Sequence, residues 1–258
     1  MSTTAVVTGA GRGLGRAIAE RLARRGHRVL VTDIDAGAAA ATAALVGGWS
    51  LAQDVRDPDS HRAVARAAAD HGRLCVWVNN AGVLAVGDTW TLADADVRRL
   101  VEVNLLGTMW GCHAAVPAMH EGGHIINIAS LSAIVPAPGL AVYGATKHGV
   151  LGYTLSLAGE LRRAASQIRV SALCPDAIAG DMTDAVAHDA AASILFSSGK
   201  LLALAAVADA AVALLDDHRL VRTLPAYRAA LIHLLRPFPS IGLPLLEQFA
   251  KLGRRRQR

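Results

Sequence analysis

Short apolar runs alternate along the chain with longer stretches of helical period. The runs are rich in β-branched residues, and the stretches between them are rich in Ala, Leu and Arg. This alternation is typical of repeated βαβ units around a parallel sheet. The runs predict seven strands, at residues 5–8, 29–33, 50–52, 74–78, 124–128, 168–173 and, more weakly patterned, 220–224. The helices between them are predicted to begin near Leu14, Ala36, Asp59, Asp94, Tyr143 and Lys200.

The order of these elements predicts an α/β fold in which helices cover both faces of a doubly wound, seven-stranded parallel sheet. Ligands bind such sheets at the carboxyl ends of the strands, where the winding direction switches. Because no internal repeat or low-complexity linker interrupts the pattern, we expect one domain over residues 1–258. Within it, residues 176–200 are predicted to form a loop region beside the substrate, and residues 226–258 a C-terminal extension.

The first predicted strand runs directly into a glycine-rich turn. Gly9, Gly13 and Gly15 have the spacing Gly-x-x-x-Gly-x-Gly, and a helix-period run follows. A turn without Cβ atoms lets the backbone approach a pyrophosphate, and the N-terminus of the next helix offers unpaired N–H groups. The alternative is a plain glycine-rich turn, but its place after the first strand favours a dinucleotide site.

A carboxylate ends the second predicted strand. Asp33 lies 24 residues after Gly9, close to the offset of the group that binds the adenosine ribose. A carboxylate there accepts hydrogen bonds from the 2′-hydroxyl and repels a 2′-phosphate, which favours NAD over NADP. Arg12 and Arg28 favour NADP instead, since either could pair with its 2′-phosphate.

Tyr143 and Lys147 are four residues apart, so they share one face of a predicted helix. A phenol with a pKa near 10 is a poor base at neutral pH, and a neighbouring ammonium would lower that pKa by stabilising the phenolate. The pair therefore predicts a proton-exchanging tyrosine. Taken alone, such a pair is more often a solvated helix face.

These motifs, in their order along the chain, resemble the short-chain dehydrogenase/reductase family in its common form of about 250 residues. The resemblance covers roughly residues 3–182 and implies a Rossmann-type fold. It rests on Thr8-Gly9-x-x-x-Gly13-x-Gly15, Asp54-Val55, Asn79-Asn80-Ala81-Gly82, Val103-Asn104, Ser130 and Tyr143-x-x-x-Lys147.

The resemblance implies a role for each matching residue. Ser130 would hydrogen-bond the substrate oxygen, Tyr143 would be the general acid/base, and Lys147 would bind the nicotinamide ribose. Asn104 would hold a water of a proton relay, at a helix irregularity. Asp54 and Val55 would meet the adenine, and Asn79 with Gly82 the adenosine side. The full set of implied cofactor contacts is Gly9, Gly11, Arg12, Gly13, Leu14, Gly15, Asp33, Ile34, Asp54, Val55, Asn80, Ala81, Gly82, Tyr143, Lys147, Pro175, Asp176 and Ile178.

The chain departs from the family pattern after the sixth strand. Family members commonly read Pro-Gly there and place a threonine a few residues later to bind the carboxamide. Here Asp176 follows Pro175 in place of the glycine, and Gly180 stands where the threonine would, with Thr183 as a possible substitute. Ile178 would still contact the cofactor through its backbone.

The C-terminus also departs from the family pattern. Leu245, Leu246, Phe249 and Leu252 fall on one helical stripe beside a basic tail. This segment is predicted to be a packed helix with a solvated tail; a lid over an apolar substrate, a subunit contact and a membrane-surface helix are the alternatives.

Composition excludes several other classes. Five basic residues of the tail, 251, 254–256 and 258, account for the net charge of +5, because the other 21 of 26 balance 21 acidic residues. A nucleic-acid partner is therefore not expected. Three isolated cysteines and the lack of an N-terminal signal pattern favour the cytoplasm, and no cluster of ligand residues suggests a metal.

The sequence thus predicts an NAD-dependent oxidoreductase that interconverts a secondary alcohol and a ketone, with preference for a hydrophobic small molecule. Family resemblance further implies a homotetramer or homodimer packed through the helices that follow Asn104 and begin at Tyr143. The alternative is a nucleotide-binding regulatory or scaffold protein of the same fold with little catalysis.

Overall fold

A parallel sheet of seven strands forms the centre of the protein, seen here in a computed structural model that describes residues 2–119, 122–217, 219–228 and 239–257. The strand order is β3-β2-β1-β4-β5-β6-β7, and every pairing is parallel. The strands are β1 (Thr3–Thr8), β2 (Arg28–Asp33), β3 (Trp49–Ala52), β4 (Arg73–Asn79), β5 (Gly123–Ile128), β6 (Ile168–Pro175) and β7 (Val221–Leu224). The winding direction reverses between β1 and β4, as the predicted doubly wound fold requires.

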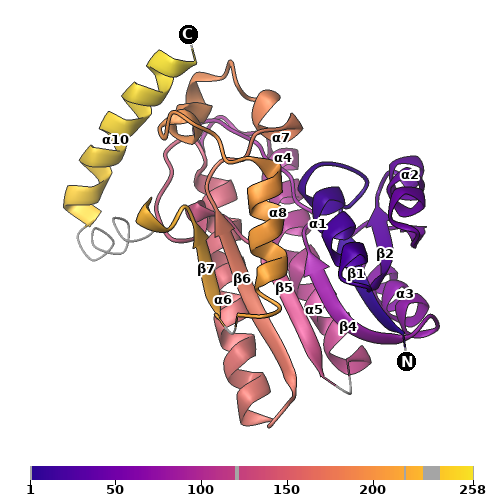
Figure 1. Ribbon diagram of the computed structural model, residues 1–258. Coiled ribbons are helices and arrows are strands. Elements are labelled where there is room, and N and C mark those ends of the chain that lie inside the picture. Colours follow the sequence, from indigo (N-terminus) through magenta and orange to yellow (C-terminus); the bar gives the residue numbers. More distant parts are fainter. Residues whose placement is uncertain (1, 120–121, 218, 229–238, 258) are drawn as a thin grey trace.

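Helices cover both faces of this sheet (Figure 1). One face packs against α1 (Gly13–Arg24), α2 (Ala36–Val46) and α8 (Leu204–Ala213). The other face packs against α3 (Pro58–Ala69), α5 (Gly107–Ala118) and α6 (Ala141–Arg163). The central strands are consequently buried on both sides, which explains why they read as continuous apolar runs in the sequence.

The remaining elements lie in the connections after β4, β5, β6 and β7. They are α4 (Asp94–Leu100), the π-helical turn η1 (Val101–Leu106), the 3₁₀ turn η2 (Leu131–Ala133), α7 (Asp181–Asp184), the 3₁₀ turn η3 (Ala190–Phe196) and α10 (Pro239–Arg256). Apart from α4 and η1, which lead into α5, these pieces are joined by irregular backbone. Function is expected at this edge of the sheet, because loops that follow parallel strands carry the ligand contacts.

All seven predicted strands are confirmed, with ends that differ by one or two residues. One predicted helix start is displaced: α8 begins at Leu204, and not near Lys200. The reason is a tertiary contact, because Leu202 pairs with Ile178 in an isolated parallel bridge, and its N–H donates to the carbonyl of Ala177 at 2.8 Å. The chain is therefore extended where its sequence alone favours a helix.

The C-terminal helix α10 lies beside the edge of the sheet that β7 forms and packs against η3 (Figure 1). Ala250 and Gly253 are buried in this contact, whereas Leu252 of the predicted apolar stripe is 42% exposed. Residues 229–238, which include the Arg236-Pro237-Phe238 part of the extension, lie outside the described residues. None of the helices that the structure describes combines the length and the apolar character needed to cross a bilayer.

Candidate active site

The four predicted catalytic residues come from the connections at the carboxyl ends of β4 and β5. Ser130 follows β5 and caps η2, its hydroxyl accepting from the N–H of Ser132 at 3.1 Å. Tyr143 and Lys147 lie one turn apart near the start of α6, and Asn104 lies in η1. The Nζ atom of Lys147 is 5.8 Å from the centre of the Tyr143 ring, so the two side chains lie on the same side of their helix.

Lys147 is almost completely buried, at 4% exposed. Its Nζ donates a hydrogen bond of 2.9 Å to the carbonyl of Ile128, the last residue of β5. Burial lowers the pKa of Lys147 to about 8, because a charged ammonium loses hydration in the protein interior; a charge interaction with Cys174 acts in the opposite direction. Lys147 is therefore mostly protonated at pH 7, and a rise of about one pH unit would make half of it neutral.

Burial has the opposite effect on the phenol of Tyr143. It raises the pKa of Tyr143 to about 12, while a hydrogen bond with Ser130 lowers it in part. The sequence predicted a lowered phenol pKa because of Lys147. Burial is the largest influence on this phenol, so the expected lowering of its pKa is not found, and Tyr143 is protonated at neutral pH.

Asn104 lies at the irregularity that the resemblance implied. Its side chain is completely buried, and it both accepts from the Val83 N–H at 2.8 Å and donates to the Val83 carbonyl at 2.9 Å. A side-chain carbon placed on Gly82 would lie 3.3 Å from Asn104 Oδ1 and 3.7 Å from Lys147 Nζ. Gly82 thus lies between the amide and the ammonium, and the π-helical turn η1 positions the amide there.

The glycine-rich turn lies between β1 and α1 with little room for side chains. A Cβ atom on Gly15 would lie 2.3 Å from the carbonyl of Gly9, and one on Gly9, at φ +60°, would lie 2.7 Å from Ala81 Cα. Around Gly13 the space is open, and Arg12 is largely exposed. The first turn of α1 carries no acidic residue, so no carboxylate of that turn would compete with a bound anion for its N-terminal N–H groups. The turn therefore fits a dinucleotide pyrophosphate.

Asp33 lies next to that turn. Its Oδ2 accepts from the N–H of Gly11 at 2.9 Å and its Oδ1 from the N–H of Asp35 at 3.1 Å. Ile34 follows with 70% of its surface exposed, as an apolar side chain beside the carboxylate. Arg28 is at the other end of β2, about 16 Å away for five residues of strand, and stacks on Trp49. Arg28 therefore does not compete for a phosphate at Asp33.

Two neighbouring asparagines at the end of β4 point in opposite directions. Asn80 donates to the carbonyls of Thr8 and Gly9, both at 2.9 Å, and so fastens the glycine-rich turn. Asn79 is buried on the other face, where it donates to Asn127 and accepts from Trp77. The prediction that Asn79 lines the adenosine side is wrong, because successive residues of a strand face opposite sides of the sheet.

The predicted adenine contacts follow β3. Val55 is buried beside Gly107, whose added Cβ would lie 3.0 Å from a methyl group of Val55. The Arg56 guanidinium pairs with both carboxylate oxygens of Asp54, and this hydrogen bonding lowers the pKa of that carboxyl. Leu14 and Ala81 are half-buried beside the glycine-rich turn.

The departures after β6 have structural consequences. Pro175 is buried, and Asp176 forms an ion pair with Arg228. Gly180 has φ +146°, a conformation that side chains disfavour. The hydroxyl of Thr183 donates back to the carbonyl of Ile178 at 2.7 Å, or of Gly180 at 2.8 Å, so it is already used within the loop.

Sequence reasoning missed several groups that hold the site together. The hydroxyl of Thr8 accepts from the N–H groups of Asn80 and Ala81, both at 3.1 Å. The hydroxyl of Thr146 donates to the carbonyl of Tyr143 at 2.7 Å and lies 3.4 Å from the amide of Asn104. These hydroxyls form hydrogen bonds with main-chain groups, and no spacing of residues in the sequence predicts such contacts. Arg228, which pairs with Asp176, was missed for the same reason.

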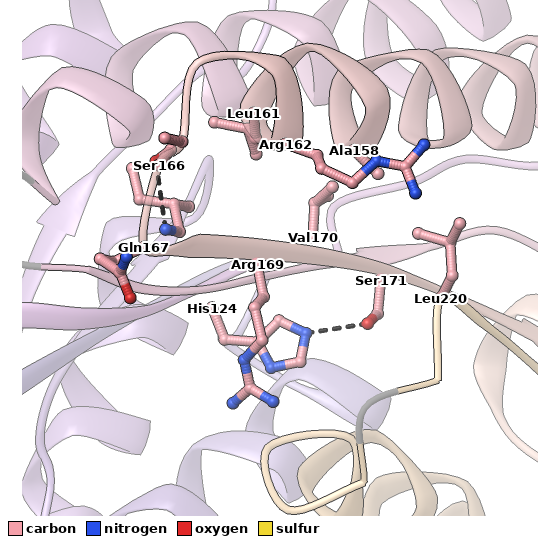
Figure 2. A pocket seen from close by; sticks show the side chains of 12 residues that line it. His124, Ala158, Leu161, Arg162, Ser166, Gln167, Arg169, Val170, Ser171 and Leu220 are labelled. Carbon is pink, nitrogen blue, oxygen red and sulfur yellow. Dashed lines mark hydrogen bonds between the residues drawn. The ribbon is translucent and has the colours of Figure 1, made fainter.

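A cavity of about 440 Å³ lies elsewhere, at the amino-terminal half of β6 and the last turns of α6 (Figure 2). His124 and Ser171 are joined there by a hydrogen bond of 2.8 Å, and Arg162 and Arg169 extend to opposite sides of the strand (Figure 2). Tyr143 and Lys147 do not line this cavity. Within the described parts of the chain, no three His, Cys, Asp or Glu side chains gather as metal ligands would.

Comparison with known proteins gives consistent matches. A family model described as short chain dehydrogenase matches residues 3–191. Carbonyl reductase family member 4 of Danio rerio is 37% identical over 196 residues, which cover 74% of this chain and 82% of that protein. The 3-oxoacyl-(acyl-carrier-protein) reductase FabG of Escherichia coli strain K12 is 36% identical over 220 residues, which cover 83% of this chain and 89% of that protein. The crystal structure of a short chain dehydrogenase/reductase from Burkholderia phymatum in complex with NAD superposes with a TM-score of 0.84 at 28% identity, covering 93% of this chain and 95% of that one.

Proposed function

The chain belongs to the short-chain dehydrogenase/reductase family of oxidoreductases, and on that premise we propose that it interconverts a ketone and a secondary alcohol with NAD as cofactor. The observation that carries the proposal is the grouping of Ser130, Tyr143 and Lys147, with the ammonium 5.8 Å from the phenol ring at the carboxyl end of β5. NADH would supply the hydride for reduction, or NAD would accept it in oxidation, and the protein would supply orientation and exchange a proton.

The glycine-rich turn and the end of β2 would hold the dinucleotide. The N–H groups at the start of α1 would bind the pyrophosphate, and Asp33 would offer carboxylate oxygens to the adenosine ribose. A 2′-phosphate would meet the negative charge of Asp33, which supports NAD over NADP. Arg12, the remaining candidate for a phosphate partner, has Asp181 3.8 Å from its guanidinium.

Tyr143 and Ser130 would act on the substrate oxygen. The Ser130 hydroxyl hydrogen-bonds that oxygen, and the Tyr143 hydroxyl exchanges a proton with it. Because the pKa of Tyr143 is raised to about 12, the phenol is protonated at neutral pH and suited to donate a proton, as reduction of a ketone requires. Lys147 would help return a proton to the phenol, and Asn104, on the other side of Gly82, would hold the water that brings this proton from solvent.

The substrate is proposed to be a hydrophobic small molecule. In the segment that leads from Ser130 to α6, the apolar side chain of Val135 is only partly buried and would face the substrate. Met182, at the start of α7, is 46% exposed on the opposite loop. A cytoplasmic location is supported by three buried cysteines, none of which forms a disulfide within the described residues.

A cofactor and substrate panel tests the proposal against the regulatory or scaffold alternative. Nicotinamide fluorescence would be followed with NADH or NADPH and a series of cyclic, aromatic and long-chain ketones. Turnover of at least one ketone, faster with NADH than with NADPH, is the expected result. Binding of NADH with no turnover of any ketone, and of any corresponding alcohol with NAD, would favour the regulatory protein.

A further inference from the structure

Asp176 replaces a small residue of the family pattern with a charged one at the end of β6. Its carboxylate is only 12% exposed and forms an ion pair with Arg228, itself 18% exposed. The second oxygen accepts from the N–H of Ala177 at 2.9 Å. A buried carboxylate is costly unless it is paired, so Arg228 is the partner that lets Asp176 occupy this position.

Arg228 reaches a third segment as well. It follows β7 in the chain, and its Nη2 donates to the hydroxyl of Ser197 at 3.1 Å. Ser197 directly follows η3, near the end of the loop region 176–200. One guanidinium therefore joins the beginning of that loop, at Asp176, to its end, at Ser197, and its planar fork is suited to hold two acceptors at once.

The same serine is held from the other side by α10. Arg256 donates to the Ser197 carbonyl at 2.6 Å, and Gly253 lies so close to η3 that an added Cβ would be 1.8 Å from the Ser193 carbonyl. The end of the loop is thus fixed between Arg228 and the C-terminal helix.

The position of η3 bears directly on the reacting centre. A Cβ atom on Gly139 would lie 2.1 Å from the carbonyl of Ala191 in η3. Gly139 is four residues before Tyr143, at the entry to α6. A displacement of η3 would therefore move the segment that leads into Tyr143, and small displacements at a reacting centre are costly.

We propose that Arg228 is a positioning residue that, through Asp176 and Ser197, holds the loop region 176–200 closed beside Tyr143 for substrate binding. The inference rests on the proposed function for its kinetic consequence. The structural claim, that Arg228 orders the loop, can be tested without any substrate.

The test compares Arg228→Met with Arg222→Met, a matched control. Arg222 is also a partly buried arginine at β7 with an aspartate partner, Asp217, but it contacts α8 and not the loop. Arg228→Lys keeps the charge and loses the fork. Since Arg228→Met leaves a buried carboxylate unpaired, the double variant Asp176→Gly/Arg228→Met removes both charges and is the variant to use if the single one does not fold.

Three measurements are made on each variant: hydrogen–deuterium exchange of peptides covering residues 181–199, the Kd of NADH, and kinetics with a ketone that the wild type reduces. For Arg228→Met and the double variant we expect faster exchange in these peptides and kcat/KM lower by about tenfold or more, mostly through KM. The Kd of NADH should stay within about threefold for Arg228→Met. Arg228→Lys should be intermediate, and Arg222→Met like the wild type.

The inference is overturned if exchange in residues 181–199 is unchanged in Arg228→Met, or if the double variant recovers wild-type exchange and KM. It is also overturned if NADH affinity falls in Arg228→Met as much as kcat/KM does. If the wild type reduces no ketone, the proposed function fails, while the exchange data still decide whether Arg228 orders the loop.

Discussion

At the scale of single residues, burial changes the proton affinity of the two residues at the reacting centre in opposite directions. It raises the pKa of the Tyr143 phenol to about 12 and lowers the pKa of the Lys147 ammonium to about 8, because the charged form of each group loses hydration inside the protein.

The pKa of Lys147 has a consequence for stability. In the folded protein it is about 8, below the value of 10.5 for an exposed lysine, so the unfolded chain binds more protons between these pH values. Stability contributed by this residue therefore rises with pH, by about 1 kcal/mol between pH 8 and pH 9. Urea unfolding of the wild type and of Lys147→Met at both pH values would measure it. The comparison is limited to pH 8 and pH 9. Burial raises the pKa of Cys174 from 9.0 to about 12, so the stability that this thiol contributes falls as the pH rises above 9. An equal pH dependence in both proteins would contradict the assigned shift.

Asp33 is predicted to set the choice of cofactor. Asp33→Ala removes the charge that a 2′-phosphate would meet, so the ratio of kcat/KM with NADPH to that with NADH should rise about tenfold or more. Asp35→Ala is the control, since Asp35 lies in the same turn but caps α2 by accepting from the Ala38 N–H. If the two variants change the ratio equally, Asp33 does not select the cofactor.

The spacing of Tyr143 and Lys147 correctly predicted that they share a helix face. It did not predict that the pKa of the phenol is raised and that of the ammonium is lowered, because both shifts come from the surrounding chain. The strand of Asn79 was predicted, but which of two adjacent asparagines faces the glycine-rich turn depends on the register of the sheet.

At the scale of elements, periodicity predicted most of the fold, and tertiary contacts account for the rest. Every strand was found. The central strands are buried on both faces and leave clear apolar runs, whereas β3 and β7 at the edges of the sheet are only partly buried and leave shorter patterns. The start of α8 was misplaced because residues near Leu202 pair with the loop after β6, a contact between distant parts of the chain. The π-helical turn was expected only from family resemblance, because the residues 101–106 themselves carry no distinctive pattern.

Threonine, the residue that the family commonly has at position 180, is predicted to destabilise the loop before α7. Gly180→Thr would place a β-branched side chain at φ +146°, at a cost of about 1–3 kcal/mol. Thermal unfolding should show a lower Tm for this variant. Ala179→Thr, at the exposed neighbouring position without positive φ, should leave the Tm almost unchanged. A Tm for Gly180→Thr equal to that of the wild type would mean that the loop readily adopts another conformation.

At the scale of the whole molecule, the C-terminal extension was the least predictable part. The helix was foreseen from its apolar stripe, and the packed form is the one observed, against η3. Its contacts could not be foreseen, because Gly253 packs by lacking a side chain and Arg256 through a main-chain acceptor. Neither contact leaves a hydrophobic signal in the sequence.

We expect the protein to form dimers or tetramers through α5 and α6. Leu155 of α6 is 43% exposed, and Leu155→Lys should dissociate the assembly into smaller species in analytical ultracentrifugation. Leu45→Lys on α2 is the control, because Leu45 is 61% exposed on a helix outside the proposed contact. A monomeric wild type, or an assembly that Leu155→Lys leaves intact, would contradict this arrangement.

The most direct test of the central claim is the turnover of Tyr143→Phe, with the Kd of NADH measured on the same sample. The phenyl ring keeps the packing of the side chain and removes only the hydroxyl that exchanges the proton. The account predicts nearly unchanged NADH affinity and a kcat lower by about a hundredfold or more. A variant that turns over as fast as the wild type would contradict the role of Tyr143, and with it the proposed chemistry.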